Sequence, residues 1–199
     1  MSFDPQTPSY FVNPGYRSAT GPALQALDPA TLEPVGRYAE SQPAEIEAAL
    51  AAVTRAQRAW MRCDAKTRAQ ALHRLAHAIE TADLRACAAL MTREMGKPYP
   101  EAIGELANCA SIFRYYAEMA RDDAGKVAGT TEAGSFQYAR YEPLGVSVHI
   151  IPFNFPILIA CWTVAASLAA GNGCIIKPAP ATTLCTLEFM RLFAALPEG

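Results

Sequence analysis

The segment that decides the fold spans residues 145–178. It reads Gly-Val-Ser-Val-His-Ile-Ile-Pro-Phe-Asn-Phe-Pro at 145–156, a largely apolar run at 157–170, and Gly-Asn-Gly-Cys-Ile-Ile-Lys-Pro at 171–178. Alternating β-branched and polar residues predict a strand at 146–150, the apolar run predicts a helix that ends at Gly171, and residues 174–177 predict a second strand. In an open α/β sheet, nucleotide cofactors bind at the carboxyl ends of such strands.

The rest of the chain predicts an α/β protein around this segment. Residues 1–40 are rich in Pro, Gly and Thr and favour an extended chain lying on a surface. Apolar residues recur at helical spacing in four segments between 41 and 121, and the third helix is expected to start near Thr81 and to end at Gly96. A Gly-rich break at 122–135 precedes strand-like residues 136–141, and a last helix is expected over 183–195.

Composition excludes several function classes. The 199 residues are 51% hydrophobic and carry a formal net charge of -2, so neither nucleic acid nor an acidic membrane is an expected partner. The six cysteines contain no Cys-x-x-Cys pair, which argues against a disulfide framework or a metal site and fits a reducing compartment. No signal peptide is evident, and the apolar run at 157–170 is too short to span a bilayer. We therefore expect a soluble, cytoplasmic protein without a bound metal.

Three features of the decisive segment are candidates for chemistry. Asn154 lies between two prolines, and its side chain could donate to an oxyanion or could cap the following helix. Lys177 ends a strand and could bind a ribose or phosphate, or simply be a solvated lysine. Phe155, Ile159 and Trp162 share a helical face that could line a substrate tunnel or pack in the core. Spacing alone favours the structural alternative in each case, and no Gly-x-Gly-x-x-Gly or Gly-x-x-x-x-Gly-Lys loop is present.

An ordered set of motifs covers nearly the whole chain. The motifs are Asp28-Pro29-Ala30-Thr31, Met95-Gly96-Lys97-Pro98, Phe113-Arg114-Tyr115-Tyr116-Ala117, Glu142-Pro143-Leu144-Gly145-Val146, Pro152-Phe153-Asn154-Phe155-Pro156, Leu168-Ala169-Ala170-Gly171-Asn172 and Lys177-Pro178-Ala179. In this order they resemble the N-terminal portion of the NAD(P)-dependent aldehyde dehydrogenase superfamily. The resemblance favours the functional alternative for both Asn154 and Lys177.

The resemblance implies a fold, an activity and a set of roles. The fold would combine an N-terminal segment and helices of the cofactor domain (1–125), a bridging hairpin used in family oligomers (126–145) and the first βαβα part of an incomplete parallel-sheet domain (146–199). The activity would be oxidation of an aldehyde to an acid with NAD or NADP. Asn154 would donate to the reacting oxygen. The cofactor would be bound by Ile150, Ile151, Pro152, Phe153, Lys177, Pro178, Ala179 and Pro180, and the aldehyde by Phe155, Ile159 and Trp162.

Departures from the family pattern limit these expectations. Phe153 stands where the family often has Trp, and Thr163 where it often has Lys. Pro180 replaces an acidic residue that would repel a 2′-phosphate, which keeps NADP possible. The family's catalytic cysteine and glutamate fall beyond residue 199, so we expect the isolated chain to be inactive. The chain would then be an N-terminal fragment, or one half of a split enzyme completed by a C-terminal half, or a non-catalytic nucleotide-binding remnant.

Overall fold

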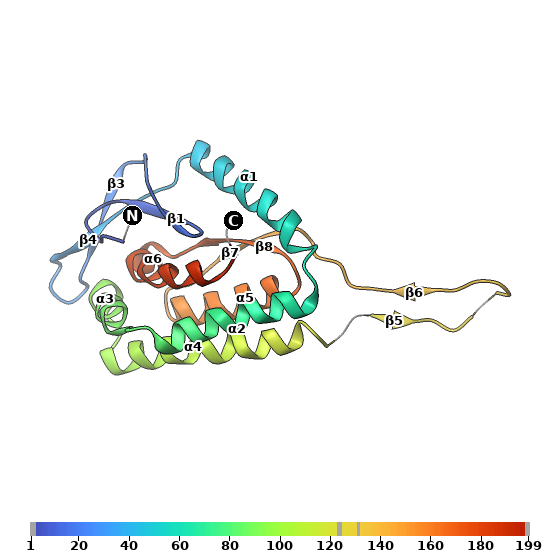
Figure 1. The fold of residues 1–199 in the computed structure, drawn as a ribbon. Coiled ribbons are helices and arrows are strands. Elements are labelled where there is room, and N and C mark those ends of the chain that lie inside the picture. The colour runs from blue at the N-terminus through green and yellow to red at the C-terminus, as the bar shows by residue number, and fades with distance from the viewer. Residues whose placement is uncertain (1–2, 123–124, 131, 198–199) are drawn as a thin grey trace.

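The computed structural model describes residues 3–122, 125–130 and 132–197. Its centre is a pair of parallel strands, β7 (Val146–Ile150) and β8 (Gly173–Lys177), with helix α1 (Pro43–Trp60) on one face and α5 (Pro156–Ala169) on the other (Figure 1). Helices α2 (Ala65–Thr81) and α4 (Tyr99–Met119) pack beside α5 as an outer layer. This layered arrangement of helices around a parallel pair confirms the α/β class.

The extended chain expected near the N-terminus is folded into two antiparallel hairpins within residues 9–39. The first pairs β1 (Ser9–Val12) with β2 (Gly15–Ser18), and the second pairs β3 (Ala23–Leu27) with β4 (Pro34–Ala39). They are tied to the C-terminal part of the chain, because the buried Tyr16 hydroxyl donates to the Leu187 carbonyl at 2.6 Å and Val35 packs against Leu184.

The helix boundaries follow local hydrogen bonds. The Asp64 carboxylate accepts from the Thr67 N–H at 2.7 Å and starts α2. The expectation that the third helix starts near Thr81 is wrong: α2 continues through Thr81, and α3 runs Arg85–Met95 after the Asp83 carboxylate accepts from the Arg85 N–H. The helix ends as predicted at Gly96, which has φ 82°.

The principal core lies between α2, α3, α4, α5 and the C-terminal helices. Its largest fully buried apolar side chains are Phe113, Leu72, Leu75, Ile79, Met91, Leu106, Ile157 and Val164. The Phe113 ring also meets Phe193 edge-on, with ring centroids 5.9 Å apart. Burial of these residues fixes α4 and α5 side by side, and this pair carries the candidate site.

The C-terminal part follows the expected strand–helix–strand–helix order. Gly171, with φ 93°, ends α5 and leads into β8, as predicted. After β8 the chain forms a 3-10 turn η1 (Pro180–Thr182), helix α6 (Thr183–Met190) and a second 3-10 segment η2 (Arg191–Ala195). The single helix expected over 183–195 is therefore divided at Met190.

A long hairpin projects from the body of the molecule (Figure 1). It contains two short antiparallel strands, β5 (Lys126–Val127) and β6 (Tyr138–Ala139). Its apolar side chains are exposed, among them Val127, Phe136, Tyr138 and Tyr141.

The two faces of β7 differ in a way that the alternation did not indicate. Its polar face lies against α5, where the Ser147 and Ser167 hydroxyls are 2.7 Å apart. Its apolar side is open: Val148 is 60% exposed and Ile150 76% exposed.

Candidate functional site

The connection between β7 and α5 presents Asn154 to solvent. Ile151 extends the strand by one residue, since its N–H donates to the Lys177 carbonyl at 3.0 Å. The next four residues, 152–155, are exposed, and α5 begins at Pro156 with Phe155 as its N-cap. The Asn154 side chain has no hydrogen-bond partner among the described residues, and no side chain at the N-cap position caps the helix. The alternative that Asn154 caps α5 is therefore wrong.

A buried carboxylate from α4 takes the place of that cap. Glu105 Oε1 accepts hydrogen bonds from the backbone N–H groups of Ile157 at 2.9 Å and Leu158 at 3.0 Å. Its other oxygen pairs with the ammonium group of Lys97, which also donates to the Asn154 carbonyl oxygen at 2.6 Å. The Lys97 nitrogen lies 3.9 Å from the centroid of the Phe155 ring, a cation–π contact. A buried ion pair thus fixes the turn that carries Asn154 on its side facing the protein interior.

Sequence reasoning missed both members of this pair as site residues. Lys97 was noted only as part of the motif Met95-Gly96-Lys97-Pro98, and no role was predicted for Glu105. The signal for Glu105 was its position on the buried face of α4, between Ala102 and Cys109, where an unpaired carboxylate would be costly. The partner could not be found that way, because the hydrogen-bonded groups on α5 lie 52 and 53 residues further along the chain.

The residues expected to bind a cofactor lie at one edge of the sheet. Parallel register places Ile150 opposite Lys177, so the two strand ends meet. Lys177 and Pro180 are exposed, as are Ile150, Pro152 and Phe153. Ile151 differs, because its side chain is buried and only its backbone can face a ligand. Pro178 and Ala179 are half-buried and lead into η1.

The helix N-termini beside this edge are already occupied by the protein's own carboxylates. Glu105 caps α5, and Glu94 caps α6 in the same way by accepting from the N–H groups of Leu184 at 2.8 Å and Cys185 at 2.9 Å. Burial raises the pKa of Glu94, and these hydrogen bonds oppose that shift. A phosphate cannot use the same N–H groups, so a nucleotide at this edge would contact strand ends and side chains instead.

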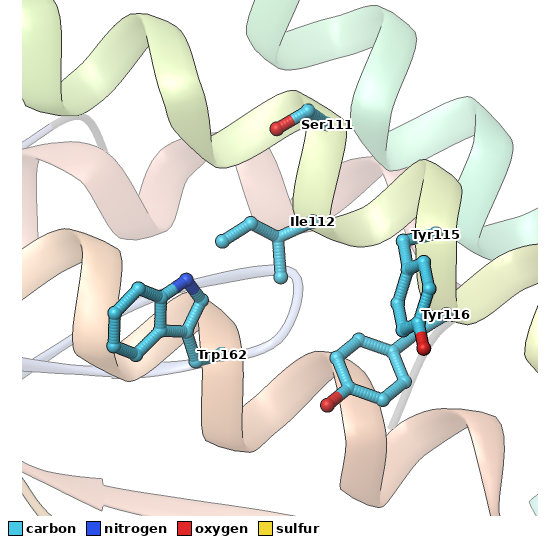
Figure 2. Close-up of a pocket in the computed structure, with 5 residues that line it drawn as sticks. All are labelled: Ser111, Ile112, Tyr115, Tyr116 and Trp162. Carbon is cyan, nitrogen blue, oxygen red and sulfur yellow. The ribbon is translucent and has the colours of Figure 1, made fainter.

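The helix face that follows Asn154 is exposed and apolar. Phe155 is 42% exposed, Trp162 50% exposed, and Ile159 is half-buried, so the alternative of ordinary core packing is wrong for the two aromatic residues. Trp162 forms one wall of a hollow of about 430 Å³ between α4 and α5 (Figure 2). Its other lining residues are Ser111, Ile112, Tyr115 and Tyr116, which the sequence did not place there. The Thr163 hydroxyl bonds within α5, to the Ile159 and Ala160 carbonyls.

Four of the six cysteines have surroundings that do not suit a nucleophile. Cys87, Cys109, Cys161 and Cys185 are buried, and all six thiols are free. Burial raises the pKa of Cys87, Cys174 and Cys185, and a contact with Cys161 together with burial raises that of Cys109. A nucleophilic cysteine needs an accessible, stabilised thiolate. The thiols of Cys87, Cys109, Cys174 and Cys185 instead lie in surroundings that disfavour the thiolate.

Two further searches cover the described part of the chain. No cluster of three or more His, Cys, Asp or Glu side chains suited to a metal is found there, and His73 pairs with Glu118 at 2.8 Å. Within the same residues, no helix is long and apolar enough to cross a membrane.

Comparison with known proteins identifies the family. The family model "Aldehyde dehydrogenase family" matches residues 16–199. Alpha-ketoglutaric semialdehyde dehydrogenase from Bacillus subtilis (strain 168) is 36% identical over 186 residues, which are 92% of this chain and 38% of that protein. An E. coli NADP-dependent enzyme of known crystal structure is 30% identical, with a TM-score of 0.87 over 94% of this chain and 39% of its own. PnpE from Pseudomonas sp. WBC-3, also solved in complex with nicotinamide adenine dinucleotide, is 32% identical, with a TM-score of 0.86 over 94% of this chain and 38% of its own.

The chain therefore spans somewhat less than two fifths of the length of these relatives. The predicted resemblance, the α/β class and the nucleotide cofactors of the relatives are confirmed by these matches. From its motifs, its fold and its relatives, the chain belongs to the aldehyde dehydrogenase family.

Proposed function

We propose that this chain supplies the oxyanion-binding asparagine, one side of the cofactor cleft and one wall of the aldehyde site of an NAD(P)-dependent aldehyde dehydrogenase. One observation carries the proposal. The Asn154 side-chain amide is exposed and has no hydrogen-bond partner among the described residues. It lies on a turn whose backbone is fixed by the hydrogen bond from Lys97, at the same edge of the sheet as Lys177. Such a group is available to donate to an oxygen that gains charge during the reaction.

The nucleotide, when bound, accepts a hydride from the aldehyde carbon. The residues of this chain then have separate tasks. Asn154 Nδ2 donates to the former carbonyl oxygen, and the Lys177 ammonium group binds the ribose hydroxyls of the nucleotide. The backbone of residues 150–153 lines the cleft between these groups, with Pro178, Ala179 and Pro180 at its other side. Either NAD or NADP fits, because residue 180 is a proline and places no carboxylate there.

The aldehyde occupies the apolar helix face. Phe155, Ile159 and Trp162 lie along one side of α5, and the hollow next to Trp162 extends this surface toward α4. Trp162 follows Phe155 by seven positions along the helix direction, a rise of about 10 Å. The tail of the aldehyde therefore lies along α5, directed away from Asn154.

The nucleophilic cysteine and the general base come from polypeptide outside these 199 residues, in the same protein or in a complementing partner. Two observations support this part of the proposal. The thiols at 87, 109, 174 and 185 have raised pKa values, and the apolar side of β7 with Val148 and Ile150 is open to a further element. The isolated 199-residue chain is therefore inactive.

We further propose that the protein is cytoplasmic and assembles as a homo-oligomer. Its six cysteines are free thiols, as in reducing compartments. The projecting hairpin within residues 126–145 exposes Val127, Phe136, Tyr138 and Tyr141, which a second subunit would cover.

The test uses the full gene product, together with any partner that co-purifies with it. NAD(P)-dependent oxidation of aldehydes is followed as the absorbance of the reduced nucleotide. Asn154→Ala is expected to lower kcat by about 10²–10³-fold. Gln70→Ala, which removes an exposed amide on α2, is the control and leaves kcat unchanged. Aldehyde oxidation by the isolated 199 residues, or an unchanged kcat in Asn154→Ala, contradicts the proposal.

A further inference from the structure

Two buried charged residues beneath the Asn154 turn have no task in the reaction proposed above. The side chains of Lys97 and Glu105 are 5% and 0% exposed, and they form an ion pair. Burying two charges costs free energy, and apolar residues of similar volume are often at least as stable. Stability alone therefore does not explain why this pair lies here.

The pair contacts the turn on both sides of Phe155. Upstream, the Lys97 ammonium group donates to the Asn154 carbonyl oxygen at 2.6 Å. Downstream, Glu105 Oε1 accepts from the first N–H groups of α5, those of Ile157 and Leu158. Lys97 itself is fixed at the junction of two helices, since it follows the left-handed C-cap Gly96 of α3 and precedes Pro98, the N-cap of α4.

These contacts fix the backbone that carries the Asn154 amide. The Asn154 side chain has no partner among the described residues, so what the protein fixes is the backbone from which this side chain projects, through the hydrogen bond from Lys97 to the Asn154 carbonyl oxygen. A displacement of about 1 Å at a catalytic group can cost about 10²-fold in rate.

We propose that Lys97 and Glu105 are positioning residues, which hold the Asn154 amide in the direction required for oxyanion binding. This inference rests on the function proposed for Asn154. The charge on Lys97 serves two acceptors at once, the Glu105 carboxylate and the Asn154 carbonyl, and so couples the start of α5 to the turn before it.

The chain contains a matched control for the structural part of this arrangement. Counted over the whole residue, Glu94 is as buried as Glu105, 4% against 3% exposed, and it also accepts two backbone N–H bonds at the start of a helix. Its helix is α6, and among the described residues it forms no hydrogen bond or ion pair with the Asn154 turn. Glu94→Gln and Glu105→Gln should therefore lower the melting temperature by similar amounts.

The kinetic test is made in the full gene product. Lys97→Met and Glu105→Gln are expected to lower kcat by about 10- to 100-fold while the KM for the aldehyde changes by less than about 3-fold. Glu94→Gln lowers the melting temperature without that loss of kcat. The double variant Lys97→Met/Glu105→Leu removes the ion pair completely, so it should regain thermal stability but not kcat. A kcat that follows the melting temperature through all four variants would overturn the proposal.

A second comparison separates this inference from the proposed role of Asn154. If Lys97 acts through Asn154, Lys97→Met has little further effect on kcat in the Asn154→Ala background, although it is harmful in the wild type. Multiplicative losses would overturn the positioning role and leave the role of Asn154 intact. An unchanged kcat in Asn154→Ala alone would instead overturn the proposed function.

A readout that does not need activity is the side-chain amide signal of Asn154 in a ¹⁵N-labelled sample, assigned by its loss in Asn154→Ala. Lys97→Met should broaden or shift this signal, whereas Glu94→Gln should leave it unchanged. An Asn154 amide signal that is the same in wild type and Lys97→Met would overturn the inference, whether or not the protein oxidises aldehydes.

Discussion

Side chains from α1 and α2 donate hydrogen bonds to the backbone carbonyls at the carboxyl end of α5. Removing one of these side chains, Arg68, should lower the free energy of unfolding by a measurable amount. Arg68 Nε donates to the Ala169 carbonyl at 3.0 Å, and its Nη1 donates to the Cys63 carbonyl at 2.5 Å. Gln57 and Trp60 bind two neighbouring carbonyls, those of Gly171 and Leu168, at 3.1 Å and 2.9 Å. Arg68 therefore joins the loop before α2 to the end of α5.

We expect Arg68→Met to lower the free energy of unfolding by about 3 kcal/mol. A hydrogen bond from a charged donor contributes about 1.5–3 kcal/mol, and the lower end applies to each of the two bonds because Arg68 is only half-buried. The favourable position of this cation at the C-terminus of α5 is part of the first of these two bonds and is not added to the sum. For a protein of this size, about 3 kcal/mol lowers the melting temperature by roughly 6–12 °C.

Urea unfolding, followed by circular dichroism and by tryptophan fluorescence, measures this loss. Arg68→Lys keeps the charge but reaches one carbonyl at most, so about half of the loss should remain. Arg62→Met, at an exposed position in the same loop, should change the free energy of unfolding by less than about 0.5 kcal/mol. A loss below about 1 kcal/mol in Arg68→Met, or one equal to that of Arg62→Met, would refute the reasoning.

Three further predictions concern buried groups. Because the pKa of Glu94 is raised in the folded state, its contribution to the free energy of unfolding is most favourable below the ordinary value of 4.5 and is lost as the pH rises toward the folded-state pKa. The melting temperature of the wild type minus that of Glu94→Gln should therefore fall from pH 4 to pH 7. Gly171→Ala should cost about 2 kcal/mol or more, because φ is 93° and the new Cβ would lie 2.9 Å from Pro143 Cγ. Tyr16→Phe should cost about 1–3 kcal/mol, since the buried Leu187 carbonyl loses its donor.

Two of these predictions have a control within the chain. For Gly171→Ala it is Gly104→Ala, which has open space around the new Cβ within α4 and should stabilise the protein by about 0.5–1 kcal/mol. For Tyr16→Phe it is Tyr10→Phe, half-buried in the same hairpin, with a negligible expected effect. For Glu94 the decisive result is the sign: a stability difference that grows from pH 4 to pH 7 would contradict the burial argument.

Local patterns predicted much of the fold. The Gly96 stop, the Gly171 stop and the two strands around residues 145–177 were predicted correctly, because caps, turns and periodicity act over a few residues. The start of α3 was predicted too early, since nothing in the hydrophobic spacing distinguishes residues 81–84 from a helix. There the Asp83 carboxylate, bonded to the Arg85 N–H, sets the boundary.

In the candidate site too, the sequence motifs indicated some features and only the packing of distant elements revealed the others. The ordered motifs indicated Asn154 and Lys177, and the parallel register brings their strand ends together as expected. The motifs did not indicate how the turn is held, because Glu105 and the α5 N–H groups are brought together only by the packing of α4 on α5. They also did not indicate the hollow between these two helices, which needs Trp162 and Tyr115 from segments 47 residues apart.

By itself, the sequence determined the family, the α/β class and the position of the decisive segment, because each rests on residue types at short, fixed spacings. The tertiary structure alone decided that Asn154 is not a helix cap, that Phe155 and Trp162 are not core residues, and that a buried Lys97–Glu105 pair lies beneath the turn. The physical reason is that side-chain exposure and charge pairing depend on which distant elements pack together, and local spacing carries no information about that choice.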